Sequence, residues 1–323
     1  MKRNEIIIPI ILLICCIITS CSERSTNPSV VEELNDITSP PSNWIKVLVV
    51  NSSNDFFAGT INGLFRSTDK GSNWDLLTLP YSLFHDINEV KITSNDDVYA
   101  PSYSLNIVYL LRSTDNGNTW FVILETPGGS IKSIEEDQYG NIYYCGFGLL
   151  KSTDYGNEWQ NLFSGGVGDV CIPNDSTIVI GVPGSFHGQI LYSTNSGISW
   201  DSTHYGVTVL SFYQYNSLIF TGGSFGDEGG GGVHKSTDGG ISWEFCGFGL
   251  NSVTSFVTNN KNQLLCGTDR GIYLTDDLGA TWQNVLADSF VTTLMRDLQD
   301  FLYAGTNHGS FLRSTDNGMT WQN

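Results

Sequence analysis

One nine-residue pattern, with the consensus x-S-x-D-x-G-x-x-W, occurs seven times in the chain. It first appears as "RSTDKGSNW" at Arg66 and last as "RSTDNGMTW" at Arg313. The tryptophans that end the copies are spaced by 46, 39, 41, 43, 39 and 39 residues. They are Trp74, Trp120, Trp159, Trp200, Trp243, Trp282 and Trp321. A β-type repeat with a period near 40 residues is typical of propellers built from four-stranded blades.

Each repeat divides into four short segments of strand-forming residues. In the sixth repeat these segments are 253–258, 264–268, 271–275 and 282–286, and in the first they are 45–50, 56–60, 63–67 and 74–78. The pattern therefore lies in the hairpin between the third and fourth strands. We expect an all-β fold, a seven-bladed β-propeller of four-stranded antiparallel blades, over residues 44–323.

Every position of the pattern has a mechanical reason to be there. The Asp oxygens can accept N–H groups of their own turn, Gly permits positive φ, and Trp offers a large apolar surface for packing between blades. We therefore interpret the pattern as structural. One carboxylate per turn is too few for a calcium site, so we predict no metal. The residues at the Asp position are Asp69, Asp115, Asp154, Asn195, Asp238, Asp277 and Asp316.

The seven copies resemble the Asp-box, or BNR repeat. Propellers with such boxes include sialidases, xyloglucanase-type glycoside hydrolases, sortilin-type receptors and the photosystem II assembly-factor family. The resemblance implies the propeller fold, and it implies that the boxes lie at the blade periphery, away from the ligand face. It does not imply one activity, because function depends on sites added to the fold.

Charge and cysteine spacing narrow the classes of partner. Charged residues make up 15% of the chain, the net charge is −18, and no basic run follows Arg3. Such a chain repels phosphate backbones, so we expect no nucleic-acid partner. No cysteine pair has the C-x-x-C spacing of zinc or redox sites, and we expect no cofactor.

The N-terminus has the features of an export signal. Lys2 and Arg3 precede an apolar core at 6–18, which predicts a signal peptide over 1–20. The ending "ITSC" resembles a bacterial lipobox, which implies a lipid on Cys21; the alternative is an ordinary signal peptide. Ser22 then implies the outer membrane of a Gram-negative cell. We expect residues 21–43 to be a tether, and the protein to be a monomer that meets the membrane only through this lipid.

The ligand face is expected opposite the repeated pattern, where second-to-third-strand turns and blade connections meet. The candidate residues on these loops are His85, Asp86, His187, His204, Tyr205, Asp227, Glu228, Asp269, Arg270 and His308. The resemblance to sialidases would require three arginines that converge on a substrate carboxylate. We exclude this activity, because Arg66, Arg112 and Arg313 directly precede copies of the pattern and so lie at the wrong end of their strands to meet at the axis.

The leading hypothesis is a non-catalytic binding or assembly scaffold for a protein or glycan, with no catalytic residue assigned. The alternative is a glycoside hydrolase that cleaves a polysaccharide with loop carboxylates on the same face. Such an enzyme needs two carboxylates about 5–10 Å apart, and the sequence singles out no pair.

The last blade is predicted to end short. Trp321 is followed by Gln322 and Asn323, which leaves little chain for a fourth strand. The segment "SVVEEL" at 29–34 is the apolar candidate to supply that strand and close the ring. A short helix at 29–34, or a sequence that is a fragment, are the alternatives.

Overall fold

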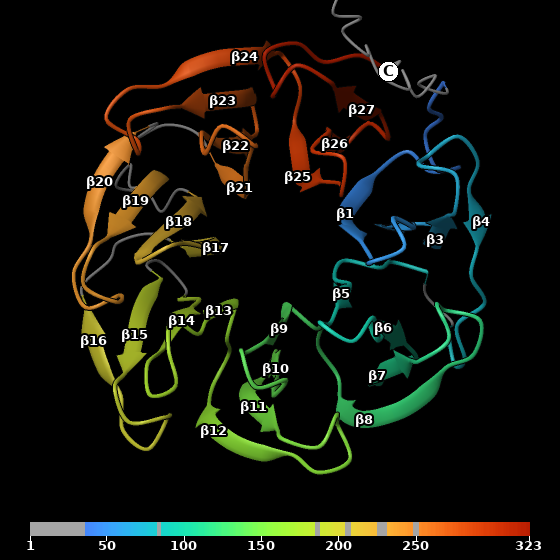
Figure 1. Cartoon of the computed structure of the whole chain (residues 1–323). Helices are drawn as coiled ribbons and strands as arrows, with labels where there is room; N and C mark the ends of the chain where they lie inside the picture. Colours follow the sequence, from blue (N-terminus) through green and yellow to red (C-terminus); the bar gives the residue numbers. More distant parts are fainter. Residues whose placement is uncertain (1–35, 83–84, 185–187, 204–207, 225–230, 248–251) are drawn as a thin grey trace, which may run out of the picture. The chain divides into compact units, whose positions relative to one another are not determined.

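The computed structural model describes residues 36–323 except 83–84, 185–187, 204–207, 225–230 and 248–251. This part of the chain is entirely β, and its strands form seven antiparallel sheets arranged as blades around a central axis (Figure 1). The predicted fold class, a seven-bladed β-propeller, is confirmed. The described residues contain no helix that is long and apolar enough to cross a membrane.

The strands follow one another from the axis to the rim in each blade. Blades 1 and 2 are β1 (Ile45–Val50), β2 (Phe56–Thr60), β3 (Gly63–Ser67), β4 (Asp75–Leu76), β5 (Lys91–Ile92), β6 (Val98–Tyr103), β7 (Ile107–Ser113) and β8 (Phe121–Pro127). Blades 3 and 4 are β9 (Ser133–Glu136), β10 (Ile142–Cys145), β11 (Gly148–Ser152), β12 (Gln160–Ser164), β13 (Asp169–Cys171), β14 (Ile178–Val182), β15 (Gln189–Ser193) and β16 (Asp201–Thr203). Blades 5 to 7 are β17 (Thr208–Tyr215), β18 (Leu218–Ser224), β19 (Gly232–Ser236), β20 (Glu244–Gly247), β21 (Val253–Thr258), β22 (Leu264–Thr268), β23 (Gly271–Thr275), β24 (Gln283–Ala287), β25 (Val291–Arg296), β26 (Leu302–Thr306) and β27 (Phe311–Ser314).

The first three predicted strands of the first and sixth repeats match β1–β3 and β21–β23 residue for residue. The fourth strands follow the prediction less closely: in blade 6, β24 covers Gln283–Ala287 rather than 282–286, and blade 7 ends short, as predicted. In blade 1 only Asp75–Leu76 is a regular strand, rather than 74–78. In the described part of blade 7 the sheet has three strands, and Gln322 adds a single bridge to Arg313.

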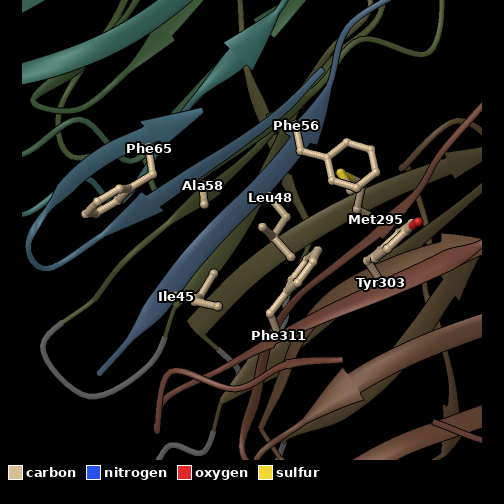
Figure 2. Close-up of a cluster of buried hydrophobic side chains, with 8 residues drawn as sticks. All are labelled: Ile45, Leu48, Phe56, Ala58, Phe65, Met295, Tyr303 and Phe311. Carbon is tan, nitrogen blue, oxygen red and sulfur yellow. The ribbon is translucent and has the colours of Figure 1, made fainter. Parts of the chain in front are cut away.

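The core consists of apolar clusters at the seams between blades. At the seam of blades 7 and 1, Leu48 and Phe56 pack against Met295, Tyr303 and Phe311 (Figure 2). The Tyr303 ring stacks on Phe311 with centroids 5.3 Å apart and meets Phe56 edge-on at 4.8 Å. Because the strand ladders stay within blades, burial of these side chains, at about 25 cal/mol per Å² of apolar surface, is the main force that joins neighbouring blades.

Glycine in the second strand of a blade lets the next blade come close. A Cβ added to Gly305 would lie 2.6 Å from Ile45, the first residue of β1. A Cβ at Gly181 would lie 2.6 Å from Val209 in β17. The inner strands can therefore approach one another only because these positions carry no side chain.

Each of the seven copies of the pattern forms a turn, and the same hydrogen bonds recur in every turn. In blade 2, Ser113 Oγ donates to Asp115 Oδ1 at 2.8 Å and accepts from Gly117 N at 2.8 Å. Asp115 also accepts from Thr119 N at 2.8 Å, and Asn116 and Gly117 both have positive φ. We call these seven segments the Ser-Asp turns.

The tryptophan of each Ser-Asp turn packs into the seam with the preceding blade. Trp159 Nε1 donates to Ile123 O in β8 at 3.2 Å, and Trp200 Nε1 donates to Leu162 O in β12 at 3.1 Å. In both cases the acceptor lies on the outer strand of the preceding blade. Trp74, in blade 1, donates instead to Thr38 O at 2.9 Å.

Residues 37–42, here called the closing segment, follow the path of an outer strand along blade 7. Thr38 N donates to Gly71 O at 2.8 Å, and Phe311 N donates to Ser39 Oγ at 3.1 Å. At the other end, Asn62 Nδ2 donates to Pro41 O at 3.2 Å. Prolines in this segment have no N–H for a strand ladder, which explains why side-chain bonds replace it. The predicted closing strand at 29–34 lies outside the described residues.

Ser113→Ala should destabilise the propeller by about 1–2 kcal/mol, because the buried Gly117 N–H loses its acceptor. Trp120→Ala should cost about 3 kcal/mol, because it opens a cavity at the seam of blades 1 and 2. Urea unfolding measures both. Ser53→Ala, at an exposed turn position, is the control and should change stability by less than about 0.5 kcal/mol. Equal stability of Ser113→Ala and wild type would contradict this account of the turns.

A chain that begins at Pro40 should melt about 5 °C lower than one that begins at Asp36. The shorter chain loses the Ile37 side chain from the seam cluster and the four hydrogen bonds that Thr38 makes with blade 1 through its N–H, hydroxyl and carbonyl groups. Differential scanning calorimetry of the two chains measures the difference. Identical melting temperatures would show that residues 36–39 do not hold the ring closed.

Candidate functional site: a basin over blades 1 to 3

Connections between strands alternate between the two faces of the propeller. The Ser-Asp turns and the hairpins between first and second strands share one face, here the turn face. The hairpins between second and third strands and the connections between blades share the other, here the connection face. Among the described residues, the predicted candidates His85, Asp86, Asp269, Arg270 and His308 belong to the connection face.

A cavity of about 530 Å³ lies on the connection face over blades 1 to 3, and we call it the basin. Its walls come from the start of β1, the connection from blade 1 to blade 2, the β6–β7 hairpin and the connection from blade 2 to blade 3. The lining residues are Lys46, Asp86, Asn88, Tyr103, Ser104, Leu105, Asn106, Ile107, Val108, Gly128, Gly129, Ser130 and Lys132. The volume lies within the range of small-molecule and peptide pockets, roughly 300–1,000 Å³.

One wall of the basin is an ion pair. Lys46 Nζ lies 2.6 Å from Asp86 Oδ1 and 2.8 Å from Oδ2. The same ammonium sits 5.1 Å from the centre of the Trp44 ring, in cation–π range. The Asp86 side chain is 53% exposed, so its free lone pairs face solvent and can accept from a ligand.

The floor of the basin is held rigid by a hydrogen-bond relay. Tyr103 Oη donates to Asn88 Oδ1 at 2.6 Å, and Asn88 Nδ2 donates to Ile131 O at 2.6 Å. Burial raises the pKa of Tyr103, so its hydroxyl stays protonated as a donor. The relay therefore joins β6 to both blade connections before any ligand arrives.

The predicted candidates are spread over several blades. Asp86 lines the basin, and His85 is exposed beside it. Asp269 and Arg270 lie in the β22–β23 hairpin of blade 6, where Asp269 Oδ1 accepts from Ser252 N at 3.2 Å. His308 is exposed in the β26–β27 hairpin of blade 7. The remaining candidates lie outside the described residues: His187, His204, Tyr205, Asp227 and Glu228.

Most of the basin was not found from the sequence. Lys46, Asn88, Tyr103, Leu105 and Lys132 carry no motif. Two of them, Lys46 and Tyr103, come from strands rather than loops. One signal was available: the 46-residue spacing between Trp74 and Trp120 is the longest of the six. The extra residues lie in the connection from blade 1 to blade 2 as well as in β6, β7 and their hairpin, and both parts form walls of the basin.

A second group of titratable residues lies on the inner strands around the axis. Lys91 of β5 pairs with Glu135 of β9 at 2.5 Å. Asp169 of β13 accepts from Phe212 N in the next blade at 2.6 Å, and burial followed by the charge of Glu135 raises its pKa to about 7. Burial also raises the pKa of Glu89 well above its ordinary value.

The position of Asp169 explains its role. Thr293, at the corresponding place in blade 7, accepts from Leu48 N at 3.1 Å, so both side chains join one inner strand to the next. Asp169 is 9% exposed and is committed to this bond, which favours a structural role over catalysis. No group of three or more His, Cys, Asp or Glu side chains in the described part of the chain could hold a metal ion.

Arg66 and Arg112, which directly precede Ser-Asp turns, have their interaction partners on the turn face. Arg66 Nη1 donates to Asn116 O at 2.5 Å and to Asn118 Oδ1 at 3.0 Å. The Arg112 guanidinium lies 4.9 Å from the Tyr155 ring centre. Each of these arginines therefore contacts the turn of the next blade.

Comparison with known proteins gives relatives of several kinds. No family model matches the chain. Xyloglucanase Xgh74A of Acetivibrio thermocellus is 26% identical over 267 residues, which is 62% of this chain and 31% of that protein. The chain thus spans about a third of the length of the curated relatives it matches.

Solved structures resemble the propeller as a whole. The GH74 xyloglucanase from Xanthomonas campestris has a TM-score of 0.71 at 16% identity, and the match covers 89% of this chain and 55% of that one. YCF48 bound to D1 peptide has a TM-score of 0.65 at 16% identity, and the match covers 86% of this chain and 95% of that one. At such identities the likeness shows the fold.

The raised pKa of Asp169 predicts a loss of stability as the pH rises from about 4 to 7. An acid with a raised pKa binds its proton more tightly in the folded state, so its contribution is full below about pH 4 and is lost as the pH rises to about 7. Asp277 has a lowered pKa, so its contribution to stability is lost at acidic pH instead. The Thr281 hydroxyl and N–H lower its pKa to about 2, so its contribution is lost as the pH falls from about 4 to 2.

The melting temperature of the wild type should therefore be highest near pH 4–5 and fall toward pH 8. Asp169→Asn keeps an oxygen for Phe212 N and should flatten the fall in melting temperature between about pH 4 and 7. Asp201→Asn, at an exposed outer-strand position, is the matched control and should leave the profile unchanged. A profile of Asp169→Asn that parallels the wild type would contradict this assignment.

Proposed function

We propose that this protein is a non-catalytic binding or assembly scaffold of the cell envelope that holds its ligand in the basin. The observation that carries the proposal is the basin itself: a pocket of ligand size on the connection face, with an exposed carboxylate, a preorganised hydroxyl–amide relay and apolar side chains. This mixture of a rigid apolar surface and a few polar groups is typical of ligand sites.

The comparisons support a protein or a glycan as the ligand. YCF48, which matches most of this chain over nearly its whole length, was solved with a peptide. The curated relatives are xyloglucanases, of which this chain matches a third. We propose that a lipid on Cys21 attaches the scaffold to the membrane, as the sequence predicts.

The alternative is a glycoside hydrolase, and its favouring observation is the xyloglucanase relative. Hydrolysis with two protein carboxylates requires a second one within about 5–10 Å of the first. Among the described residues that line the basin, Asp86 is the sole carboxylate, and its partner is Lys46. The scaffold therefore accounts better for this site.

Gly128→Asn should block ligand binding without unfolding the protein. Gly128 has φ 60°, and a Cβ there would meet nothing within 4 Å, so the new side chain enters open space at the basin. Asn tolerates this backbone region better than most residues. The ligands are found on a glycan array and a peptide array with wild-type protein, and the affinity of any hit should fall at least about tenfold in the variant.

Gly239→Asn is the matched control, because Gly239 also has positive φ and open space but lies in the Ser-Asp turn of blade 5. It should bind as the wild type does. A ligand that binds both variants equally would place the site elsewhere. Release of reducing sugar from xyloglucan or another polysaccharide would favour the hydrolase.

A further inference from the structure

We propose that the basin binds a polypeptide segment that presents a carboxylate next to an apolar side chain. The proposal rests on the proposed function, that the basin is the ligand site, and adds the chemistry of the ligand. Three features of the basin carry it: an unpaired cation, unpaired backbone N–H groups beside that cation, and two exposed apolar side chains that flank them.

The unpaired cation is Lys132. Two lysines and one aspartate line the basin, so it is locally positive in a chain whose net charge is −18. Lys46 is already paired with Asp86. Lys132 is exposed and has no ion pair or side-chain hydrogen bond within the described residues. An anion that enters the basin therefore gains a partner without breaking an existing pair.

The backbone next to Lys132 adds donors for the same anion. Gly128 and Gly129 have φ of 60° and 85°, and Gly128 N donates to Asn106 O at 2.7 Å. The N–H groups of Gly129 and Ser130 have no acceptor in the described part of the chain. Successive N–H groups in turn conformations form concavities that bind anions, and a carboxylate oxygen fits such donors.

Two apolar side chains flank this connection. Leu105, at the tip of the β6–β7 hairpin, is 75% exposed, and Phe147, in the β10–β11 hairpin, is 65% exposed. The Phe147 ring lies against Gly129, since a Cβ added there would fall 2.3 Å from the ring. Large apolar side chains gathered at a pocket mark an interaction site more often than isolated ones do.

A polypeptide matches this combination better than a sugar. An extended peptide places side chains every 3.3 Å or so on alternating sides, which can deliver an acidic and an apolar group to neighbouring points. Leu105 offers no flat face for a sugar ring to stack on, and the Phe147 ring already packs against Gly129. The acidic remainder of the surface repels an acidic segment elsewhere, which confines binding to the basin.

The test uses the full chain and fluorescein-labelled heptapeptides of alternating Glu and Leu, acetylated and amidated at their ends. Matched peptides carry Gln for Glu or Ser for Leu. Fluorescence anisotropy should show binding of the Glu/Leu peptide that weakens with salt. Lys132→Gln should weaken it about tenfold and abolish the preference over the Gln peptide, and Leu105→Asn should weaken it severalfold.

Each variant has a matched control. Lys261→Gln removes an exposed lysine from the β21–β22 turn on the turn face, and Ile198→Asn removes an apolar side chain that is 85% exposed in a Ser-Asp turn. Both should bind as wild type does. The proposal is overturned if Lys132→Gln leaves the affinity unchanged, or if the Glu and Gln peptides bind equally.

Different results would overturn the proposal that the basin is the ligand site and the proposal that its ligand is an acidic, apolar peptide. Binding of xyloglucan oligosaccharide or oligogalacturonate that Gly128→Asn abolishes, with no binding of the peptides, overturns the peptide ligand and leaves the basin as the ligand site. Absence of binding to every peptide and glycan, in protein with a wild-type melting curve, counts against both proposals.

Discussion

The propeller depends on apolar packing across its seams, since the strand ladders stay inside the blades. Each seam combines β-branched or aromatic side chains from two inner sheets with the tryptophan of one Ser-Asp turn, as Ile45, Phe311 and Trp74 do between blades 7 and 1. Glycines such as Gly305 bring the sheets close enough for this contact. Any one seam is weak beside the sum, and the closed ring leaves no blade with an uncovered side, because each blade packs at two seams.

The fold was predictable because every blade repeats the same physical solution. Seven copies of S-x-D-x-G-x-x-W fix the hairpin at one end of each third strand, and the 39- to 46-residue spacing leaves room for four strands. The repeat does not indicate where an individual blade departs from the common arrangement. The closing segment at Thr38 depends on contacts between residues more than 30 positions apart, which no local pattern records. The pattern also does not indicate that the outer strand of blade 1 is short.

The site was predictable only in part. Loop position identified the connection face, and Asp86 is the predicted candidate that lines the basin there. Lys46, Tyr103 and Lys132 belong to it because three blades converge, and each of them alone is an ordinary strand or loop residue in the sequence. The residues predicted from the sequence are mainly acidic and histidine side chains. The described basin is formed mainly by lysines, amides, hydroxyls and apolar groups.

The closing segment has a mechanical consequence. Thr38 and Ser39 hold the seam of blades 7 and 1 through a few hydrogen bonds and one apolar contact, and the chain that precedes Asp36 is continuous with them. Tension applied to that chain enters the propeller at this one seam and acts along the segment, against bonds that are fewer than those inside any regular blade. Under load the closing segment would detach first, while the apolar cluster at this seam and the individual sheets stay folded.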